Sequence, residues 1–408
     1  MTAHRLVVVG ASLAGLRAAE AARRGGYQGQ IVLIGDEPHL PYDRPPLSKQ
    51  MLEPGPGAPH DPTFRSREHL TDQLGIQLEL STRATALDVV ERTVHCGDRE
   101  VPYDTLILAT GSTARRLDGT QHLDGIHTLR SLDDCHKFRR DLATAKRVVV
   151  VGAGFIGAEC ASAARARGME TTIVEAAPVP LVRAYGEHMG RVCAQLHERN
   201  GVSLRLGAQV QGFDGSDRVE AVRLSDGTRL EADLVVVGVG ADPAVEWLRS
   251  ADLEVESGVN CDSFLATSAP DVYAAGDVAR WHNPVFDQSM RLETWSSASE
   301  QAAVAARNAL KLDKPKEYGT VPYTWTDWYG SRLQFVGAPT AEDIKIVLGD
   351  EQSERFVALY RQGDRLVGAL AMNNSSVVMK YRAMIGAGAS WQDGLDFAAE
   401  RAARLSRV

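Results

Sequence analysis

The sequence predicts an α/β protein that contains two copies of a strand–turn–helix–strand unit and ends in an α+β domain. Three observations predict this fold. The copies begin with "RLVVVGASLAG" (5–15) and "RVVVVGAGFIG" (147–157), in which a β-branched run meets a Gly-rich turn. An Ala-rich stretch and a second apolar run follow each turn, which is the order of a parallel βαβ unit. After Pro315 the pattern changes to aromatic-rich and alternating segments, which are typical of antiparallel strands.

Each copy predicts its elements in the same order. In the first we expect a strand over 6–9, a helix over 16–24 and a parallel strand over 30–34. In the second we expect a helix over 158–167 and a strand over 171–174. A helix between two short apolar strands is the crossover that a parallel pair needs. The two units therefore predict two Rossmann-like dinucleotide-binding domains.

The remaining elements follow from alternation or from short apolar runs. Residues 54–62 are rich in Pro and Gly, so we expect a surface loop there. The other expected elements are antiparallel strands at 78–95, a buried strand at 103–111, a strand pair at 202–210 and 220–224, a buried strand at 233–238, an Ala-rich helix at 294–311, an aromatic-rich stretch at 322–336 and a hairpin at 355–370.

The composition argues against several classes of protein. A chain of 408 residues is too long for one core, and its net charge of −8 opposes binding to nucleic acid, which is itself an anion. The N-terminus has no signal-peptide layout, and no apolar run approaches the roughly 20 residues that span a bilayer. We therefore expect a cytoplasmic protein without a membrane segment. The five Cys form no CxxC pair, which predicts reduced thiols and no metal site.

The turn of the second copy has the full G-x-G-x-x-G spacing, with Gly152, Gly154 and Gly157. Backbone N–H groups in such a turn hold a pyrophosphate together with the helix N-terminus. Phe155 and Ile156 complete the turn and are counted among the candidate cofactor-binding residues. Tight packing of a helix on a strand can produce the same spacing, so the turn needs a second sign of nucleotide binding.

Glu175 supplies that second sign. It ends the strand that follows the turn and the helix, where an acid can bond the ribose of an adenosine. The next residues are Ala176 and Ala177, so no Arg directly follows to receive a 2′-phosphate. The second copy therefore predicts binding of NADH rather than NADPH.

The turn of the first copy departs from this motif at one position. Gly10 and Gly15 match it, whereas Ser12 replaces the glycine that lets the backbone approach a pyrophosphate closely. Ser is the mildest such replacement, and its hydroxyl can bond a phosphate oxygen. Asp36 and Glu37 follow the second strand as the candidate acids of this copy. The alternative, a degenerate repeat that binds no nucleotide, stays open.

Two further segments end a strand in a glycine turn. They are "LATG" (108–111) and "VYAAGD" (272–277). A carboxylate at such a turn, here Asp277, can accept hydrogen bonds from a polyol chain. The alternative is that Asp277 caps a helix that begins at Val278.

The order of these motifs resembles that of the flavoprotein disulfide-reductase superfamily, which has two dinucleotide-binding domains and a glutathione-reductase-like fold. Within it, four segments resemble the oxygenase-coupled NADH–ferredoxin reductases of the putidaredoxin and rubredoxin reductase type, and the apoptosis-inducing-factor type. The four segments are "PYDRPPLSK" (41–49), "LRSLDD" (129–134), "RLETW" (291–295) and "YTWTDWYGSRLQFVG" (323–337). The resemblance runs essentially end to end, and Arg-Pro-Pro-Leu-Ser-Lys is its most specific part.

The resemblance implies how cofactors and domains are distributed. FAD would bind the first copy and the GD segment, and NADH would bind the inserted second copy. The FAD-binding domain would comprise 1–112 and 245–320, and the NAD-binding domain 113–244. Residues 321–408 would form the C-terminal reductase domain.

The resemblance also implies four candidate catalytic residues, which act by positioning. Lys49 would lie beside the reactive edge of the flavin, and Glu159 and Glu293 would frame the nicotinamide pocket. Trp325 would pack by the isoalloxazine, near the point where electrons leave. Each has a plainer alternative. Lys49 can be a solvated lysine, and Glu159 a first-turn acid that the helix dipole favours. Glu293 can be a surface ion-pair partner, and Trp325 a core aromatic.

Further cofactor contacts rest on the resemblance alone. Arg44 and Arg130 would contact the phosphate or adenosine of FAD, and Asp277 its ribityl chain. The other candidate cofactor-binding residues are Thr110, Gly111, Arg183, Gly240, Gly276, Thr294 and Trp295. The chain departs from the family at Ser12, where a glycine is expected, and at Ser297, where an asparagine is common.

One absence narrows the function. Disulfide reductases of the superfamily carry a Cys pair, and NADH peroxidases and oxidases one Cys, where this chain has 45–49, "PPLSK". Electrons would therefore leave from the flavin itself. We expect an NADH-dependent ferredoxin reductase, in which FAD accepts hydride from NADH and passes single electrons to a 2Fe–2S ferredoxin. That ferredoxin would serve a Rieske dioxygenase or a cytochrome monooxygenase. The alternatives are a rubredoxin reductase, an NADH oxidase or an NADH-sensing protein of the apoptosis-inducing-factor type.

An acidic ferredoxin needs a basic surface on this acidic chain. Arg307 and Lys311 are four residues apart in the expected Ala-rich helix, which would place them on one face. Lys314 and Lys316 extend this group of cations. The alternative is a solvated helix end whose cations complement the dipole.

Overall fold

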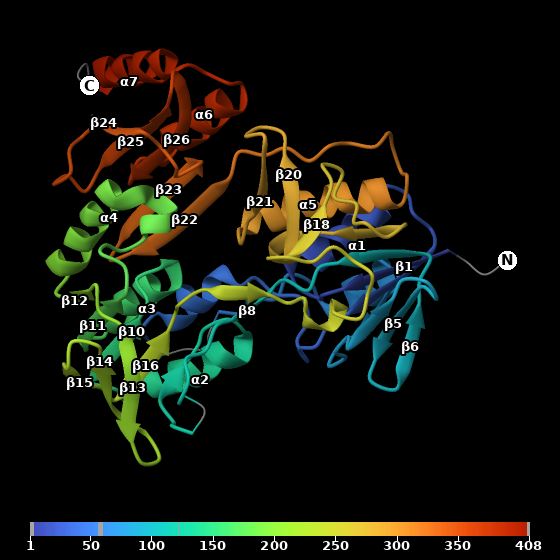
Figure 1. Cartoon of the computed structure of the whole chain (residues 1–408), viewed down its shortest axis with the longest axis horizontal. Helices are drawn as coiled ribbons and strands as arrows, with labels where there is room; N and C mark the ends of the chain where they lie inside the picture. The colour runs from blue at the N-terminus through green and yellow to red at the C-terminus, as the bar shows by residue number, and fades with distance from the viewer. Residues whose placement is uncertain (1–3, 56–59, 121, 406–408) are drawn as a thin grey trace. The chain divides into compact units, whose positions relative to one another are not determined.

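The computed structural model describes residues 4–55, 60–120 and 122–405, which form two compact units (Figure 1). Part of the expected loop at 54–62 lies outside the described residues. Unit 1 is made of the segments Met1–Asp43, Asp61–Thr113 and Asp242–Pro322. Unit 2 is made of the segments Arg44–His60, Ala114–Ala241 and Tyr323–Val408.

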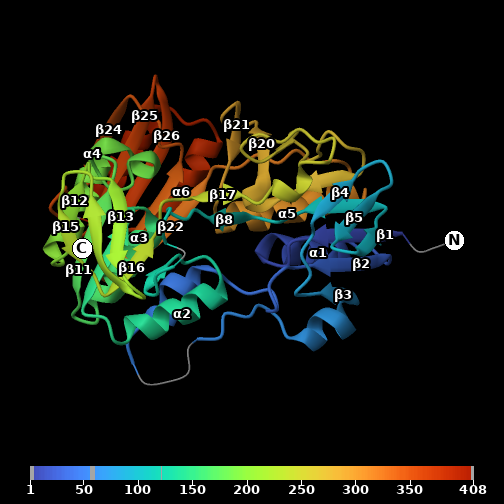
Figure 2. The ribbon, with the colours of Figure 1, turned by 60° about the horizontal axis from the view of Figure 1, so that its bottom comes forward.

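Unit 1 is built on a five-stranded parallel sheet in the order β19-β7-β1-β2-β3. Its strands are β1 (Arg5–Val9), β2 (Gln30–Ile34), β3 (Ile76–Glu79), β7 (Thr105–Leu108) and β19 (Val272–Ala274). Helices α1 (Leu13–Arg24) and α5 (Trp295–Ala309) pack against each other (Figure 2). The first copy is therefore a parallel βαβ unit, as its Gly-rich turn between β-branched runs predicts.

Smaller elements complete unit 1. They are the antiparallel strands β4 (Ala86–Asp88), β5 (Thr93–Cys96) and β6 (Arg99–Pro102), the sheet of β18 (Val259–Cys261), β20 (Ala279–Asn283) and β21 (Gln288–Arg291), and the short turns of helix η3 (His69–Gln73), η4 (Glu246–Leu248) and η5 (Gly276–Val278). Two short strands, β8 (Ser112–Ala114) and β17 (Ala241–Pro243), lie where the chain passes between the units.

Unit 2 contains the second copy, again in a five-stranded parallel sheet, with the order β12-β11-β10-β16-β9. Its strands are β9 (Ile126–His127), β10 (Arg147–Val151), β11 (Glu170–Glu175), β12 (Ser203–Leu206) and β16 (Leu234–Val237). The other elements of this part are α2 (Leu132–Leu142), α3 (Phe155–Arg165), α4 (Val182–Arg199), η1 (Pro45–Ser48), η2 (Gln50–Leu52) and an antiparallel sheet of β13 (Val210–Gly215), β14 (Val219–Leu224) and β15 (Arg229–Glu231).

Two strand assignments made from alternation are right only in part. In the stretch 78–95, β4 and β5 are antiparallel as expected, whereas β3 joins the parallel sheet beside β2. The stretch 202–210 pairs with 220–224 only at Val210, the first residue of β13, because β12 pairs with β11. Alternation shows that one face of a strand is buried, but it does not show which strand lies alongside.

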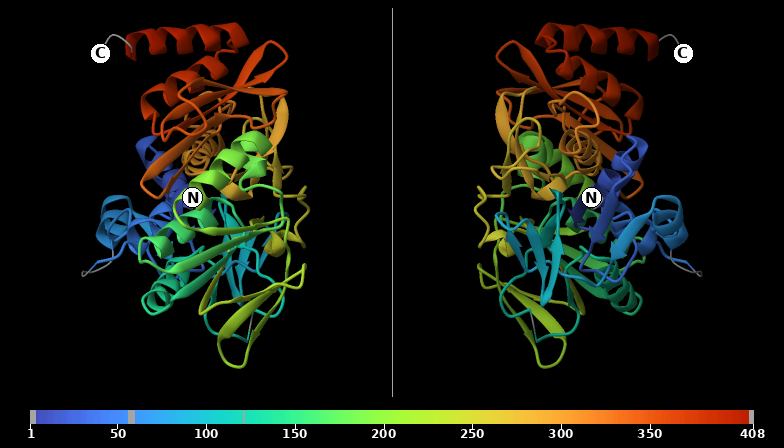
Figure 3. Two further views of the ribbon diagram at one scale, coloured as in Figure 1. Left: turned by 90° about the vertical axis from the view of Figure 1, so that its left-hand side faces the viewer. Right: turned by 90° about the vertical axis from the view of Figure 1, so that its right-hand side faces the viewer.

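The C-terminal part of unit 2 is an antiparallel sheet in the order β22-β23-β26-β25-β24, followed by two helices (Figure 3). Its elements are β22 (Tyr323–Trp328), β23 (Ser331–Gly337), β24 (Asp343–Leu348), β25 (Phe356–Gln362), β26 (Arg365–Met372), α6 (Ser375–Gly386) and α7 (Trp391–Leu405). Helix α6 packs on β23 and β26, and α7 on β24 and β26. The expected hairpin at 355–370 is confirmed as β25 and β26. The predicted fold class, two parallel nucleotide-binding folds and a C-terminal α+β part, is confirmed.

An aromatic core connects this C-terminal sheet with the helices of the second copy. Phe155 of α3 contacts Tyr185 of α4, with ring centroids 5.8 Å apart. Tyr185 contacts Phe335 of β23 at 5.7 Å, and Phe335 contacts Tyr360 of β25 at 5.1 Å. Tyr185 and Tyr360 have no exposed surface. Helices α3 and α4 and the C-terminal sheet therefore share one hydrophobic core within unit 2.

His197 of α4 belongs to this buried region. Its ring stacks on Trp328 at 5.0 Å, and its Nδ1 lies 2.7 Å from the hydroxyl of Tyr329. The residue has no exposed surface, and its Nε2 has no hydrogen-bond partner among the described residues. Burial lowers the pKa of His197 to about 4, since the charged imidazolium would lose its hydration there.

His197 should therefore make stability depend on pH. In the unfolded chain the imidazole has a pKa of about 6.5, whereas in the folded chain it becomes protonated only near pH 4. Stability is lost as pH falls from about 6.5 to 4, and wild type should lose about 2 kcal/mol more between pH 7 and 5 than His197→Gln. Urea unfolding of both proteins at the two pH values measures this difference. Equal losses would show that His197 is not buried as a neutral ring.

Candidate functional site

The glycines of the second turn serve two different purposes. A Cβ at Gly152 would overlap with the carbonyl oxygen of Gly238, and one at Gly157 would overlap with that of Gly152. Gly152 also has φ +100°, which disfavours any other residue. A Cβ at Gly154 would meet only the oxygen of Gly238, 4.0 Å away, and would otherwise point into open space. The packing of α3 on β10 requires Gly152 and Gly157, whereas Gly154 leaves room for a ligand.

Glu175 is held beside this turn. It is the last residue of β11, and its carboxylate accepts hydrogen bonds from the backbone N–H groups of Ala153 (2.7 Å) and Ala177 (2.9 Å). One of these donors belongs to the glycine turn itself. Ile156, in the first turn of α3, is 40% exposed despite its apolar side chain. The acid and the turn are therefore neighbours in space, as a site for the adenosine half of a dinucleotide requires.

The first turn has the same construction. A Cβ at Gly10 would overlap with the carbonyl oxygen of Ala109, and one at Gly15 would overlap with that of Gly10. Ser12 is the N-cap of α1 and has an extended backbone, with φ −113° and ψ −156°. Gly154 is the N-cap of α3 in a similar conformation, with φ −80° and ψ −173°. The side chain of Ser12 thus occupies the position at which the second turn leaves open space.

The acids after β2 lie where the sequence places them, at the end of that strand. Glu37 accepts a hydrogen bond of 2.6 Å from the hydroxyl of Tyr42. Asp36 follows Gly35, whose N–H donates to the carbonyl of Glu79 on β3.

The GD segment is anchored from both sides. The hydroxyl of Ser112 donates to Asp277 at 2.8 Å, and the N–H of Gly276 donates to Gln301 of α5 at 2.8 Å. Asp277 lies inside η5, whose N-cap is Ala275, so it does not cap a helix that begins at the next residue. The Nε2 of Gln301 is buried and has no hydrogen-bond partner among the described residues. An orphaned donor beside this turn is the feature expected where a ligand supplies the acceptor.

The candidate residues around β21 and the start of α5 are held by hydrogen bonds and an ion pair. Arg291 donates to the carbonyl oxygen of Asp277 at 3.0 Å and forms an ion pair of 2.8 Å with Glu293. The side chain of Glu293 is 38% exposed, which agrees with its plainer interpretation as an ion-pair partner. The hydroxyl of Thr294 caps α5, and the indole N–H of Trp295 donates to Asp43 at 2.8 Å.

Three smaller contacts concern the remaining candidates. The hydroxyl of Thr110 donates to the carbonyl of Ala244 at 2.9 Å. Gly240 has φ +104°, and its carbonyl accepts the N–H of Arg115 at 3.0 Å. Arg183 lies in the first turn of α4.

Arg44 and Arg130, which the resemblance places together, are in contact within unit 2. The guanidinium of Arg44 donates to the carbonyl oxygen of Arg130 at 2.5 Å. Arg130 directly precedes the capping box of α2, in which the side chains of Ser131 and Asp134 bond each other's N–H groups. The capped start of α2 therefore fixes the carbonyl to which Arg44 bonds.

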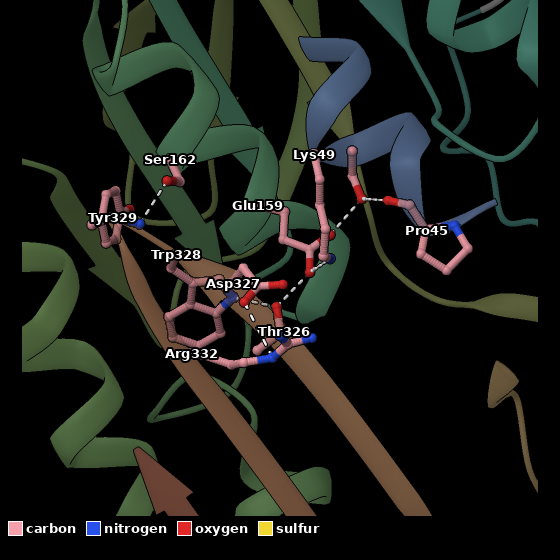
Figure 4. Close-up of polar contacts among 10 residues, drawn as sticks. Pro45, Lys49, Glu159, Ser162, Thr326, Asp327, Trp328, Tyr329 and Arg332 are labelled. Atoms are coloured by element: carbon pink, nitrogen blue, oxygen red, sulfur yellow. Dashed lines mark hydrogen bonds and ion pairs between the residues drawn. The ribbon is translucent and has the colours of Figure 1, made fainter. Parts of the chain in front are cut away.

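A buried polar cluster joins η1, α3 and β22 (Figure 4). Lys49 forms an ion pair with Glu159, and the hydroxyl of Ser48 bonds the other carboxylate oxygen. The hydroxyl of Thr326 also bonds Glu159, at 2.5 Å, and accepts the indole N–H of Trp328 at 2.6 Å. The side chains of Lys49 and Glu159 are only 14% and 3% exposed.

This cluster overturns the plainer interpretations of two residues. Lys49 is not a solvated lysine, and Glu159 is not a first-turn acid in water, because α3 begins at Phe155 and Glu159 is buried on it. Burying a charge is tolerated only where partners compensate for the lost hydration, and Glu159 has three donors. Three donors around one buried carboxylate make Glu159 a candidate functional residue.

Sequence reasoning missed Ser48, Thr326 and Trp328. The first adjoins Lys49 and the second adjoins Trp325, so strand alternation could have placed Thr326 on the opposite face from Trp325. Trp325 stacks on Tyr323, two residues away on the same face, with ring centroids 5.6 Å apart. No sequence signal shows that the other face of β22 meets Glu159.

The expected basic helix face is not formed. Helix α5 ends at Ala309, and Lys311 follows it with φ +51°, so Arg307 and Lys311 do not share a helical face. Arg307 is paired with Asp313, at 2.9 Å from its Nε. The positive charge expected there is therefore partly neutralised.

Residues 4–55, 60–120 and 122–405 contain no group of three or more His, Cys, Asp or Glu that could hold a metal ion. No helix in the same part of the chain is long and apolar enough to cross a bilayer.

Comparison with protein families gives two matches. Residues 4–302 match the family model described as pyridine nucleotide-disulphide oxidoreductase, and residues 323–406 match the one described as reductase C-terminal. Among curated proteins, the chain is 39% identical to the biphenyl dioxygenase system ferredoxin–NAD(+) reductase component of Paraburkholderia xenovorans (strain LB400), over 91% of this chain and 90% of that protein. It is 36% identical to the anthranilate 1,2-dioxygenase system ferredoxin–NAD(+) reductase component of Burkholderia cepacia, over 95% and 96%.

A solved structure gives the same result. The chain is similar to the reductase in the crystal structure of the covalent putidaredoxin reductase–putidaredoxin complex. The TM-score is 0.90 and the identity 33%, over 95% of this chain and 94% of that chain.

The two kinds of glycine in the second turn should respond differently to substitution. Gly157→Ala should destabilise the fold by about 1–3 kcal/mol, because the new methyl overlaps with a backbone oxygen that cannot move away. Gly154→Ala should cost at most about 1 kcal/mol of stability, the scale of a poorer N-cap, but weaken NADH binding, because its methyl enters the ligand space. Urea unfolding and NADH titration of both variants measure the two effects. A Gly154→Ala protein with unaltered NADH affinity would contradict this assignment.

Proposed function

The chain belongs to the pyridine nucleotide-disulphide oxidoreductase family, and on that premise we propose that it is an NADH-dependent, FAD-containing ferredoxin reductase. Two relatives that it matches almost end to end are named ferredoxin–NAD(+) reductase components of dioxygenase systems. Bound FAD would supply the chemistry that connects two-electron oxidation of NADH with one-electron reduction of a 2Fe–2S ferredoxin.

The observation that carries this proposal is the absence of a redox thiol. All five Cys are free, and burial raises the pKa of every one of their thiols. A reactive cysteine needs the opposite, a lowered pKa in a partly exposed, positively charged place. In the segment Pro45–Lys49 the chain instead has a buried lysine paired with Glu159. Electrons must then pass to an acceptor outside the chain.

The residues of unit 2 fit NADH. The turn at Gly152–Gly157 would hold the pyrophosphate, with Gly154 leaving room for it. Glu175, fixed by two backbone N–H groups, would accept the ribose hydroxyls of the adenosine. Glu159, two residues after Gly157 on α3, would orient the nicotinamide end through its buried carboxylate.

The residues of unit 1 fit FAD. The turn formed by Gly10, Ser12 and Gly15 would hold its pyrophosphate, and the hydroxyl of Ser12 would add a phosphate contact. Asp277 would accept the ribityl hydroxyls. The orphaned amide of Gln301, beside this segment, would gain its missing acceptor.

The partner would be a 2Fe–2S ferredoxin that serves a Rieske dioxygenase or a cytochrome monooxygenase. Trp325 of β22 would mark the place where electrons leave, since it carries a partly exposed aromatic pair with Tyr323. We place the protein in the cytoplasm, where the carriers of such oxygenase systems receive electrons from NADH.

Reduction of candidate acceptors tests the proposal. The purified protein with NADH should reduce a 2Fe–2S ferredoxin much faster than it reduces rubredoxin or O₂, measured anaerobically for the carriers. Faster reduction of rubredoxin, or an oxidase activity that exceeds carrier reduction, would favour the corresponding alternative. A very slow reaction with every acceptor would favour a sensing role.

Glu175 should determine the preference for NADH over NADPH. Its ionised carboxylate accepts ribose hydroxyls and repels a 2′-phosphate. Glu175→Ala should therefore reduce the preference for NADH over NADPH, expressed as the free energy that corresponds to the ratio of their kcat/KM values, by roughly 1–3 kcal/mol. Glu175→Gln is the matched control, because it keeps the shape and one acceptor while removing the charge. Equal kcat/KM values for the two cofactors in wild type would show that Glu175 does not discriminate.

Trp325 should act in delivery to the ferredoxin rather than in oxidation of NADH. Trp325→Ala should retain FAD and its NADH–ferricyanide activity but lower the rate of ferredoxin reduction on the order of 10-fold, the scale of one lost anchoring side chain. Stopped-flow measurements of the two half-reactions separate the effects. An impaired reaction with NADH alone would move Trp325 to the nicotinamide pocket.

A further inference from the structure

We propose that Thr326 of β22 is a positioning residue for the nicotinamide end of the NADH site. It acts by fixing the carboxylate of Glu159, on the helix that carries the nucleotide-binding turn. The inference rests on the proposed function only for the role of Glu159. The hydrogen bonds themselves lie entirely within unit 2.

The direction of each hydrogen bond follows from the chemistry of the groups. An indole N–H is a donor only, so the hydroxyl oxygen of Thr326 must accept from Trp328, at 2.6 Å. The single proton of that hydroxyl is then left for Glu159, whose Oε1 lies 2.5 Å away. Trp328 therefore orients the hydroxyl, and the hydroxyl orients the carboxylate.

The surroundings make this arrangement rigid. Thr326 and Trp328 have no exposed surface, and Glu159 is 4% exposed, so water does not compete for these bonds. The indole is stacked on His197 of α4 at 5.0 Å with an interplanar angle of 22°. The backbone N–H of Tyr329 donates to the hydroxyl of Ser162 on α3 at 2.8 Å, which ties β22 to the same helix.

Thr326 donates to Glu159 from a different part of the fold than the other two donors do. Lys49 and Ser48 belong to one segment beside η1 and bond the carboxylate from there. Thr326 is the donor from the C-terminal sheet. Without it, both remaining donors lie on one chain segment and the carboxylate is free to move toward them. A shift of about 1 Å in a positioning group is enough to lower a rate 100-fold in unfavourable cases.

The test compares variants that differ by single polar atoms. Thr326→Val removes the hydroxyl and keeps the β-branched shape, which suits a strand. It should lower kcat for NADH oxidation with ferricyanide on the order of 10-fold, the scale of a hydrogen bond to a charged group, and leave KM for NADH within about 2-fold. Thr326→Ser restores the hydroxyl and should restore kcat. Trp328→Phe leaves the hydroxyl unoriented and should fall between them.

Two further variants test whether the loss of kcat comes from the unpaired indole N–H of Trp328 or from any Thr→Val change in β22. Thr326→Val leaves the indole N–H of Trp328 unpaired, so the double variant Thr326→Val/Trp328→Phe removes that orphan and should fold while keeping the lowered kcat of Thr326→Val. Thr324 lies on the same strand, and its side chain makes no hydrogen bond within the described part of the chain. Thr324→Val should therefore match wild type in kcat.

A double-mutant cycle with Glu159→Gln decides the coupling. If Thr326 acts through Glu159, adding Thr326→Val to Glu159→Gln should cause much less than its single-variant loss, both in kcat and in stability to urea. Additive losses, or no rescue by Thr326→Ser, would overturn the proposal. The urea cycle needs no NADH. A chain that does not oxidise NADH would thus refute the proposed function, while the urea cycle would still report on the coupling.

Discussion

The closeness of helix and strand at the two glycine turns is the constraint on which the rest of the structure depends. In each turn the sixth residue of the motif approaches the first so closely that a methyl group would overlap with a carbonyl oxygen, Gly15 with Gly10 and Gly157 with Gly152. Only glycine permits this approach, and the helix N-terminus then faces the carboxyl ends of the parallel strands. The same contact that packs the domain thus exposes the backbone N–H groups that bind a dinucleotide.

This constraint explains why so much of the fold could be predicted from the sequence. Sterics demand glycine at fixed positions, and buried parallel strands demand β-branched runs, so both leave a readable pattern at 5–15 and 147–157. The pairing of strands left no such pattern. Strand β3 alternates like an antiparallel strand but lies parallel to β2, and β12 does the same beside β11. Burial of one face determines which side chains of a strand point inward. Which strand lies alongside it depends on contacts between residues that are distant in the sequence.

The residues of the site likewise fall into those that a local sequence pattern indicates and those that only distant contacts bring together. Glu175 and the glycine turns follow from local spacing, because the acid ends the strand next to the turn. The ion pair of Lys49 with Glu159 joins residues 110 positions apart, and only the family resemblance pointed to either. Nothing in the sequence indicated that Thr326 contacts Glu159, because the two residues are 167 positions apart. In physical terms, a buried charge needs several donors, and the fold collects them from η1 and from the C-terminal sheet.

The chain carries two dinucleotide sites, of which the first holds a flavin adenine dinucleotide. The most direct measurement is to denature the purified protein and identify and count the released nucleotide. We expect a yellow protein that releases one FAD per chain, which shows that the FAD is not covalently attached. Release of FMN, or of no flavin, would contradict this expectation, because the first turn would then be a structural repeat that binds no dinucleotide.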